Sequence, residues 1–407
     1  MPESAIAEPS VSAPSRISPV TVWFMASSTG VIVANMYYIQ PLLADIARDF
    51  GLSVVKIGFV ATLAQIGTSL GMLFFVPLGD TKERRSLITI LLVTATLALT
   101  AIATARNAPW LAVACFVLGM TGSSVHVFVP FAAHLAPPEQ RGRVVGSVFS
   151  GILLGILLAR TFSGTVGAHL GWRAVYAIAA GLMLAIALLV QFLLPHSRPA
   201  LDLPYLSLLK STVHLIGKYP ALRESAFFGG ALFSCFTAFW TTLIFFLEKP
   251  PYHYGSEAAG FFGLVGAAGA AAAPIVGRFT DKRGPRVAIG ASLLSVLAAY
   301  ALMWVFGTKL AGLVAGVLLM DMGVQAGHVA NQTRIYGIEP EARSRLNMFY
   351  MVCYFGGGAV GTLCGAYAWR LAGWPGVCAF CVAVMCVALA VFAATRKKSG
   401  AGASPAL

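Results

Sequence analysis

Four polar side chains recur at helical spacing within the otherwise apolar stretch 310–333. They are Asp321, Gln325, His328 and Gln332, and a helix would present all four on one face. Such a face cannot lie against lipid, because a charge at the bilayer centre costs about 2.5 to 3.5 kcal/mol. The spacing therefore predicts a polar surface inside a membrane protein, with Asp321 near the middle of the bilayer and His328 about two turns closer to the cytoplasm.

Asp321 and His328 are predicted to exchange protons. Removal from water favours the neutral form of a carboxyl group, so a buried acid can take up and release a proton, and imidazole titrates near neutral pH. Two other interpretations of Asp321 stay open. It could belong to an inert polar core held by hydrogen bonds, or it could bind a cationic substrate directly.

Arg160 is the one basic residue that falls inside a predicted membrane span. A guanidinium in this place can bind a carboxylate or phosphate of a substrate, and it can equally form a structural ion pair with Asp321. Since it lies toward the outer end of its span, the long side chain could also reach the outer surface. The sequence leaves these roles open.

Further polar and aromatic side chains are predicted to line a substrate cavity. In the first span, Pro41 removes a backbone donor and should bend the helix beside several polar groups. His126 is the counterpart of His328 in an internal repeat. The predicted substrate-binding residues are Asn35, Tyr38, Gln40, His126, Arg160, Trp240, Gln325 and Asn331. Packing between helices is the alternative for these positions.

Twelve stretches are long and apolar enough to cross a bilayer, which takes roughly 20 residues. They run approximately from 20–43, 57–78, 87–105, 110–133, 144–167, 173–194, 225–247, 258–276, 287–306, 310–333, 346–368 and 375–394. The composition agrees, because 58% of the residues are hydrophobic and only 11% are charged. The predicted fold class is an all-α integral membrane protein.

A short pattern of one acidic and three basic residues occurs twice between these spans. The first copy is Asp80, Lys82, Arg84 and Arg85, and the second is Asp281, Lys282, Arg283 and Arg286. Internal duplication inside hydrophobic sequence is typical of secondary transporters. We therefore predict two pseudo-symmetric six-helix bundles, at 20–194 and 224–395, joined by a cytoplasmic linker at 195–223 and flanked by cytoplasmic tails at 1–19 and 396–407.

The basic residues define the expected topology. Most of the 28 Lys and Arg residues lie in the tails and in the even-numbered loops, which places both termini in the cytoplasm by the positive-inside rule. Since the net charge of +13 is spread over short loops, no nucleic-acid partner is expected. The expected partners are the lipid bilayer, a small-molecule substrate and protons, and the chain is expected to be a monomer in a bacterial inner membrane.

Cofactors and metals are not expected. All seven cysteines lie in predicted spans, where they behave as small apolar residues. Cys378 and Cys381 form a CxxC pair, but no second pair accompanies them. The two repeat-related histidines also lack a neighbouring ligand cluster.

The repeated loop carries a specific family resemblance. The stretch Gly277-Arg-Phe-Thr-Asp281-Lys-Arg-Gly284-Pro-Arg286 resembles the loop signature of the major facilitator superfamily, and the stretch from Asp80 to Arg85 is a degraded first copy. Asn35-Met-Tyr-Tyr-Ile-Gln-Pro-Leu-Leu and Leu154-Gly-Ile-Leu-Leu-Ala-Arg-Thr161 look like the twelve-helix efflux permeases grouped with arabinose-efflux and drug:proton antiporter proteins. This resemblance covers essentially the whole chain.

The resemblance implies alternating access between two bundles, with the repeated loops as cytoplasmic gates. The predicted gating residues are Asp80, Arg84, Arg85, Asp281, Arg283 and Arg286. It also implies export of a small drug-like or sugar-like compound in exchange for protons, and no enzymatic activity. Two positions depart from the pattern: Cys115 stands where many proton-coupled relatives carry Arg, and Ile156 replaces a Pro. Uptake or facilitated exchange of a sugar or organic anion is therefore the alternative.

Overall fold

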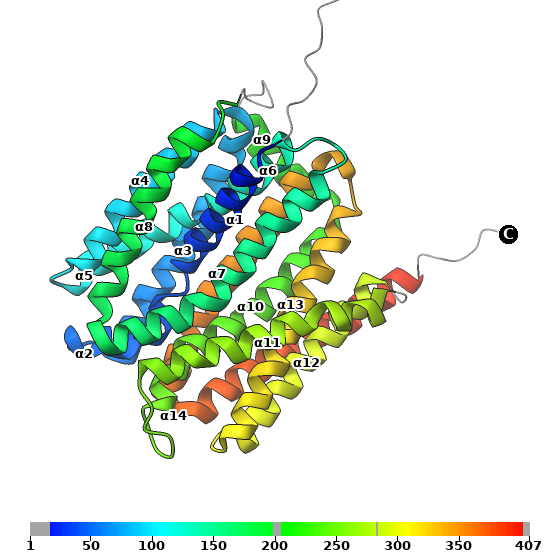
Figure 1. Ribbon diagram of the computed structural model, residues 1–407. Helices are drawn as coiled ribbons and strands as arrows, with labels where there is room; N and C mark the ends of the chain where they lie inside the picture. Colours follow the sequence, from blue (N-terminus) through cyan, green and yellow to red (C-terminus); the bar gives the residue numbers. More distant parts are fainter. Residues whose placement is uncertain (1–16, 198–204, 282–283, 402–407) are drawn as a thin grey trace, which may run out of the picture.

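The computed structural model describes the backbone of residues 17–197, 205–281 and 284–401, and the side chains of these ranges except at 80, 206–209, 272–281, 340 and 396–401. All regular secondary structure in these ranges is helical, and the helices form two groups that lie side by side (Figure 1). The predicted all-α membrane fold is confirmed.

Eight helices make up the first half. They are α1 (Pro19–Ala34), α2 (Ile39–Asp49), α3 (Val54–Thr81), α4 (Arg84–Ala103), α5 (Ala108–Gly122), α6 (Val125–Leu135), α7 (Arg141–Leu170) and α8 (Trp172–Leu193). Together α1 and α2 correspond to the first predicted span, and α5 and α6 to the fourth. The first half thus supplies six membrane-crossing segments.

The second half follows α9 (Tyr205–Lys218), a helix inside the predicted linker. Its elements are α10 (Pro220–Leu247), α11 (Ser256–Asp281), α12 (Pro285–Phe306), α13 (Leu310–Tyr336), η1 (Pro340–Ala342) and α14 (Arg343–Ala401). The backbone is not helical at Ala372 and Gly373, so α14 contains two spans. It also continues to Ala401 and enters the segment predicted as a tail, whereas most of residues 1–19 lies outside the described residues.

The count of spans agrees with the sequence. Among the described residues, ten helical stretches are long and apolar enough to cross a membrane, and one of them, Arg343–Thr395, contains two predicted spans. The remaining predicted span, 258–276, falls on α11. Each of the twelve expected segments is therefore present as a helix.

Two spans of the first half are interrupted at their middle. The first is interrupted between Ala34 and Ile39, just before Pro41. The ring of a proline conflicts with the carbonyl four residues earlier, which is that of Tyr37, so the interruption lies one turn before the proline. In the other span, α5 ends at Gly122 and α6 begins at Val125, with the Ser123 hydroxyl donating to the Met120 carbonyl at 2.8 Å. Gly and Ser pairs of this kind favour kinks.

The internal repeat is visible in the contacts. Arg85 of α4 donates to the carbonyl of Gln191 in α8, and Arg286 of α12 donates to the carbonyl of Phe392 in α14. Each of these donors and acceptors has its repeat counterpart in the other half. Gly171 and Gly373, also a repeat pair, both have positive φ values of 83° and 61°. The duplication seen in the sequence is thus preserved in local geometry.

Helices α1 and α7 approach each other through glycines. A β-carbon at Gly155 would lie 2.1 Å from the carbonyl oxygen of Gly30, and one at Gly151 would lie 2.0 Å from that of Ala26. Small residues permit such backbone contacts in lipid, where the hydrophobic effect does not drive helices together. In the second half, α10 and α14 approach each other in the same way, because a β-carbon at Gly357 would lie 2.3 Å from the carbonyl oxygen of Gly230.

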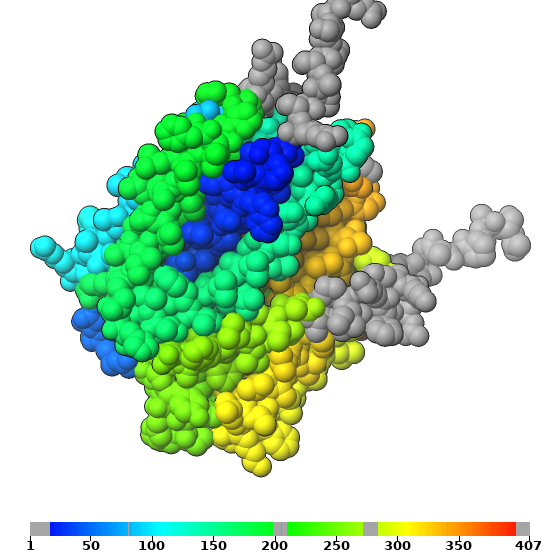
Figure 2. Space-filling view, viewed as in Figure 1, coloured from blue at the N-terminus to red at the C-terminus, as the bar shows by residue number. Residues whose placement is uncertain are grey.

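One outer face of the first half is hollowed. Figure 2 shows α1 lying between α7 and α8, and a groove of about 560 Å³ is lined by residues of these three helices. Large apolar side chains such as Trp23, Leu154 and Leu158 are more than half exposed along it. An apolar exposed surface of this kind is expected of a face that contacts acyl chains.

Gly155→Ala is expected to destabilise the protein, because the added methyl group must push apart two backbones that touch. Overpacking of this kind costs about 1 to 3 kcal/mol. Gly181→Ala in α8 is the matched control, since a β-carbon there meets no atom within 4 Å. Thermal unfolding of both purified variants in detergent measures the effect. Equal unfolding temperatures would contradict the close packing of α1 on α7.

Candidate functional site

Arg160 is buried at the contact of the two halves. It lies on α7 and is 3% exposed, so it does not extend to the outer surface as one interpretation of the sequence allowed. Its Nε donates to Oε1 of Gln40 in α2 at 2.6 Å. The guanidinium carbon lies 3.9 Å from the ring centroid of Trp240 in α10, and the Tyr37 and Phe236 rings are at 4.7 Å and 5.4 Å. Cation–π contacts of this kind are favourable when water is excluded.

Asp321 lies near the middle of α13 and is 4% exposed. It is covered by α11, because a β-carbon at Gly266 would lie 2.9 Å from Asp321 Oδ2 and 2.9 Å from Cζ2 of Trp240. Its Oδ2 is buried and has no hydrogen-bond partner. The carboxyl group therefore faces the protein interior, as predicted, with Trp240 beside it.

Successive glycines of α11 allow this arrangement. Gly260 approaches the backbone of Arg160, Gly263 approaches its side chain, and Gly269 approaches the β-carbon of Asp321 at 3.2 Å. Because each step of three residues falls about 60° short of a full turn, these glycines follow a line that winds around α11. The first two meet Arg160 of α7 and the later ones meet Asp321 of α13, so α11 packs between the two charged residues.

His328 is held by aromatic residues of α14. Its Nδ1 lies 3.0 Å from the hydroxyl of Tyr350, and its ring centroid is 4.7 Å from that of Tyr354. One turn further along α13, the amide of Gln332 donates to Asn347 at 3.2 Å. His126 is close enough to His328 for their charges to interact. The repeat-related histidines therefore lie in the same part of the interior, one from each half.

A small cavity whose largely apolar wall carries several polar groups lies between the halves. Its volume is about 30 Å³, roughly enough for one water molecule, and it is lined by Asn35, Gln40, Gln65, Thr68, Cys115, Thr241 and Thr362 together with apolar residues. The side-chain oxygens Asn35 Oδ1 and Gln65 Oε1 are buried there without a hydrogen-bond partner. Asn35 and Gln40 thus lie where the sequence placed them, while Gln65 and Thr68 were missed because isolated polar residues in a span give no pattern.

Three other predicted binding residues take different positions. Tyr38 lies against Phe162 with tilted rings whose centroids are 5.5 Å apart, and it lines the outer groove, while Tyr37 contacts Arg160 in its place. Asn331 is fully buried and donates to Gly327 of its own helix at 2.8 Å. Gln325 is half-buried. Because the backbone at residues 35–38 is irregular, Tyr37 and not the predicted Tyr38 contacts Arg160. Helical periodicity cannot predict such a change.

The two halves contact each other along α3 and α14, where the Ser69 hydroxyl donates to the Val352 carbonyl at 2.9 Å, and along α7 and α11, at the end of α7 that was predicted to face outward. Thr161 donates to the Gly260 carbonyl at 3.2 Å, and Arg48 of α2 pairs with Glu248. Figure 1 shows α7 and α11 close together at this end and diverging toward the other. The two helices are therefore in contact on the predicted outer side and apart on the other side.

The first repeated loop is anchored by residues of its own half and by Ser197 at the start of the predicted linker. Burial would raise the pKa of Glu83, but hydrogen bonds from the backbone of Ser197, the side chain and backbone of Ser86 and the backbone of Arg85 outweigh it and lower the pKa to about 2. Arg84 is buried and donates from Nε to the Gly79 carbonyl at 2.9 Å. The side chains of Asp80 and Asp281, and the whole of Arg283, lie outside the described residues, so the predicted gating role stays a prediction.

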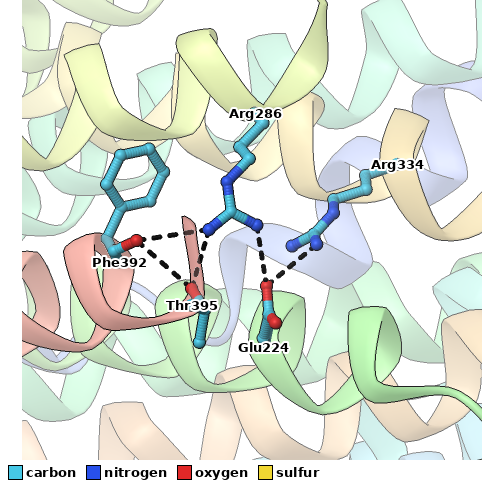
Figure 3. A network of polar contacts seen from close by, with 5 residues as sticks. All are labelled: Glu224, Arg286, Arg334, Phe392 and Thr395. Carbon is cyan, nitrogen blue, oxygen red and sulfur yellow. Dashed lines mark hydrogen bonds and ion pairs between the residues drawn. The ribbon is translucent and has the colours of Figure 1, made fainter. Parts of the chain in front are cut away.

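The second repeated loop joins a polar network that connects four helices. Arg286 of α12 and Arg334 of α13 both pair with Glu224 of α10, at 3.2 Å and 2.9 Å (Figure 3). Arg286 also donates to Thr395 and to the Phe392 carbonyl in α14. Each partner belongs to the second half, so the network holds the ends of that half together.

These features define a multi-pass membrane protein whose two halves enclose buried charges. Solved transporters share the fold: a bacterial homologue of the human lysosomal transporter Spinster, in an inward-facing state, aligns with a TM-score of 0.75 at 15% identity over 92% of this chain and 95% of that one. The nucleoside transporter NupG gives 0.73 at 12% identity over 92% and 99%.

Sequence comparison identifies the family. Residues 25–335 match the family model described as Major Facilitator Superfamily, and the chain belongs to this family of transporters. It is 40% identical to the uncharacterized transporter YgaY of Escherichia coli over 89% of this chain and 92% of that protein. It is 32% identical to the probable transporter SCO4007 of Streptomyces coelicolor over 87% and 83%. The resemblance drawn from the loop motifs is confirmed, and the protein is a transporter and not an enzyme.

Gly266→Ala is expected to change the tryptophan emission of the purified protein, because the added methyl group displaces the Trp240 ring from its place beside Asp321. The same substitution in a Trp240→Phe background is the control, and there it should leave the emission of the other six of the seven tryptophans unchanged. An unchanged spectrum in the Trp240 background would contradict the contact.

Glu224→Gln is expected to destabilise the second half, since it leaves two arginines without their shared carboxylate. Loss of one partner in a partly buried charged network costs about 1 to 3 kcal/mol. Asp45→Asn is the comparison, because Asp45 pairs with the exposed Arg48 and surface pairs contribute about 0 to 1 kcal/mol. Denaturation in detergent separates the two variants, and a smaller effect for Glu224→Gln would argue against the network.

Proposed function

We propose that the protein exports a small organic compound in exchange for protons by alternating access, with Asp321 as the proton carrier. The observation that carries this proposal is the burial of Asp321, with an unpartnered oxygen, in the same site as Arg160. A carboxyl group in such surroundings is stabilised when it is protonated, and it loses the proton when water or a cation reaches it.

The surroundings of Asp321 support proton exchange. The ionisable groups near enough to interact with its charge include Arg160 of α7, Tyr37 between α1 and α2, and Tyr354 of α14. Tyr354 also contacts His328, which extends the set of titratable groups along α13 toward the predicted cytoplasmic side. We therefore assign His328 as a second proton-binding group.

The arrangement of the halves supports an inward-open state. Contacts between α7 and α11 bring the halves together on the predicted outer side, which is the side that an inward-open state keeps closed. In this proposal both termini are cytoplasmic, the membrane is a bacterial inner membrane, and the repeated loops gate the opposite side. The chain works as a monomer. A membrane potential of about 100 mV contributes roughly 2.3 kcal/mol for each charge moved, which suffices to drive a concentration gradient.

A second candidate function is uptake or facilitated exchange of a sugar or organic anion. Arg160 favours the anion, because it is a buried cation beside the cavity wall formed by Gln40. The two candidates differ in the direction of flux against an imposed pH gradient. Vesicles that contain the purified protein and a pH-sensitive dye distinguish them when neutral, cationic and anionic compounds are supplied on one side.

Asp321→Asn is expected to abolish transport driven by a pH gradient and to retain substrate exchange at equal pH, because the amide cannot bind the coupling proton. Proton flux and solute flux in reconstituted vesicles measure both properties. Asp49→Asn serves as the control, because Asp49 is exposed and pairs with Arg173 inside the first half, and this variant should behave like the unmodified protein. Undiminished pH-driven flux in the Asp321 variant would remove Asp321 from the mechanism.

A further inference from the structure

The hydrogen bonding of Arg160 is incomplete. Its Nε is bound by Gln40, but Nη2 is buried and has no hydrogen-bond partner. A buried donor that has left water without gaining a partner is destabilising, and more so when it carries a charge. This part of the guanidinium is therefore available to an acceptor that is not part of the chain.

The nearby acid does not supply that acceptor. In the described part of the chain, ion pairs within 4.0 Å join other residues, and neither Arg160 nor Asp321 takes part in one. The Trp240 ring stacks on the Arg160 guanidinium and lies beside Asp321 at Gly266. The structural ion pair considered from the sequence is therefore not formed, and both Arg160 and Asp321 keep an unpartnered polar atom.

The aromatic rings fix the orientation of the guanidinium. Trp240 and Tyr37 contact it at 3.9 Å and 4.7 Å, and Gln40 holds its Nε edge. A guanidinium that is stacked and anchored in this way loses little further freedom when it binds a planar carboxylate. The site is thus prepared for a carboxylate and not for a spherical ion.

The charge of the site selects a monoanion. Among the described residues that contact this site or line the adjoining cavity, Arg160 is the one Lys or Arg, and the cavity offers the neutral groups of Asn35, Gln40 and Thr241. A dianionic phosphate would need a second positive charge, whereas one carboxylate is neutralised by Arg160 alone. The amide and hydroxyl groups of the cavity wall would then contact the remainder of the ligand when the halves open.

We infer that the transported substrate is a small organic monocarboxylate whose carboxylate binds Arg160, an inference that rests on the second candidate function, transport of an organic anion. Asp321 then affects binding through its charge, because an ionised Asp321 repels the carboxylate and a neutral one does not. Protonation of Asp321 and binding of the anion therefore favour one another, so the proton and the anion would cross the membrane in the same direction.

The test measures binding to the full-length protein purified in detergent. Benzoate, gluconate and lactate are the probes, their uncharged amides are the matched compounds, and the change in unfolding temperature at constant ionic strength reports binding. At least one carboxylate should stabilise the protein, and its amide should not. Arg160→Gln should weaken binding of this carboxylate about 30-fold or more, as expected when one partner of a buried charged contact is removed. Arg160→Lys should weaken it by about tenfold, because lysine keeps the charge but lacks the planar guanidinium that binds both carboxylate oxygens.

Arg173→Gln is the matched control. Arg173 also stacks on an aromatic ring, that of Trp172 at 4.2 Å, but it is partly exposed and paired with Asp49. This variant should bind the probe as the unmodified protein does. Asp321→Asn should bind it at least as tightly, since the competing negative charge is gone.

Three outcomes would overturn the inference: no carboxylate stabilises the protein more than its amide does, Arg160→Gln binds as well as the unmodified protein, or inorganic phosphate binds in preference to all three carboxylates. Failure of the proposed function is distinguishable. If Asp321→Asn keeps its pH-driven flux while Arg160→Gln no longer binds the carboxylate probe, the proposal of proton coupling through Asp321 is wrong, and the inferred anion site at Arg160 is supported.

Discussion

Burial of the Arg160 guanidinium between the two halves is the constraint on which the arrangement of this transporter depends. A cation in this place is tolerated only when aromatic faces and a hydrogen-bond acceptor replace water. Here α10 supplies Trp240 and α2 supplies Gln40. The glycines of α11 let that helix come close enough to exclude solvent. Residues of both halves are needed, so the site is complete only while the halves are in contact.

The contacts that join the halves on the predicted outer side are individually weak. Arg48 is 60% exposed in its pair with Glu248, and exposed pairs contribute about 0 to 1 kcal/mol. The remaining contacts of α7 with α11 are between small residues and backbone atoms, which gain packing energy without hydrophobic burial. Within each half, by contrast, glycine-mediated packing and the Glu224 network are extensive. The balance favours movement between the halves and not inside them.

The sequence predicted the fold well because membrane spans follow from hydrophobic length. It also predicted that Asp321 faces the interior of the protein, since exposure of this charge to lipid is costly, whereas for Arg160 it left a position at the outer surface open. It could not predict the role of Tyr37, because the interrupted backbone at residues 35–38 departs from helical periodicity. It also could not place Gly263 and Gly266 at the charged residues, since helix contacts depend on tertiary geometry that one sequence does not contain. The missing ion pair between Arg160 and Asp321 follows from the position of Trp240, which the sequence did not specify.

The two interruptions, at residues 35–38 and 123–124, have no equivalent in the second half, where α10 and α13 are continuous through the membrane. A continuous helix resists bending, whereas an interrupted helix can bend at the interruption. The two duplicated halves therefore differ in stiffness: α10 and α13 of the second half are rigid, and the corresponding spans of the first half can bend at mid-membrane depth. Gln40 lies just beyond the interruption at residues 35–38, so bending at this interruption would move the Gln40 oxygen away from Arg160. The conformation of the first half would then be coupled to the occupancy of the site.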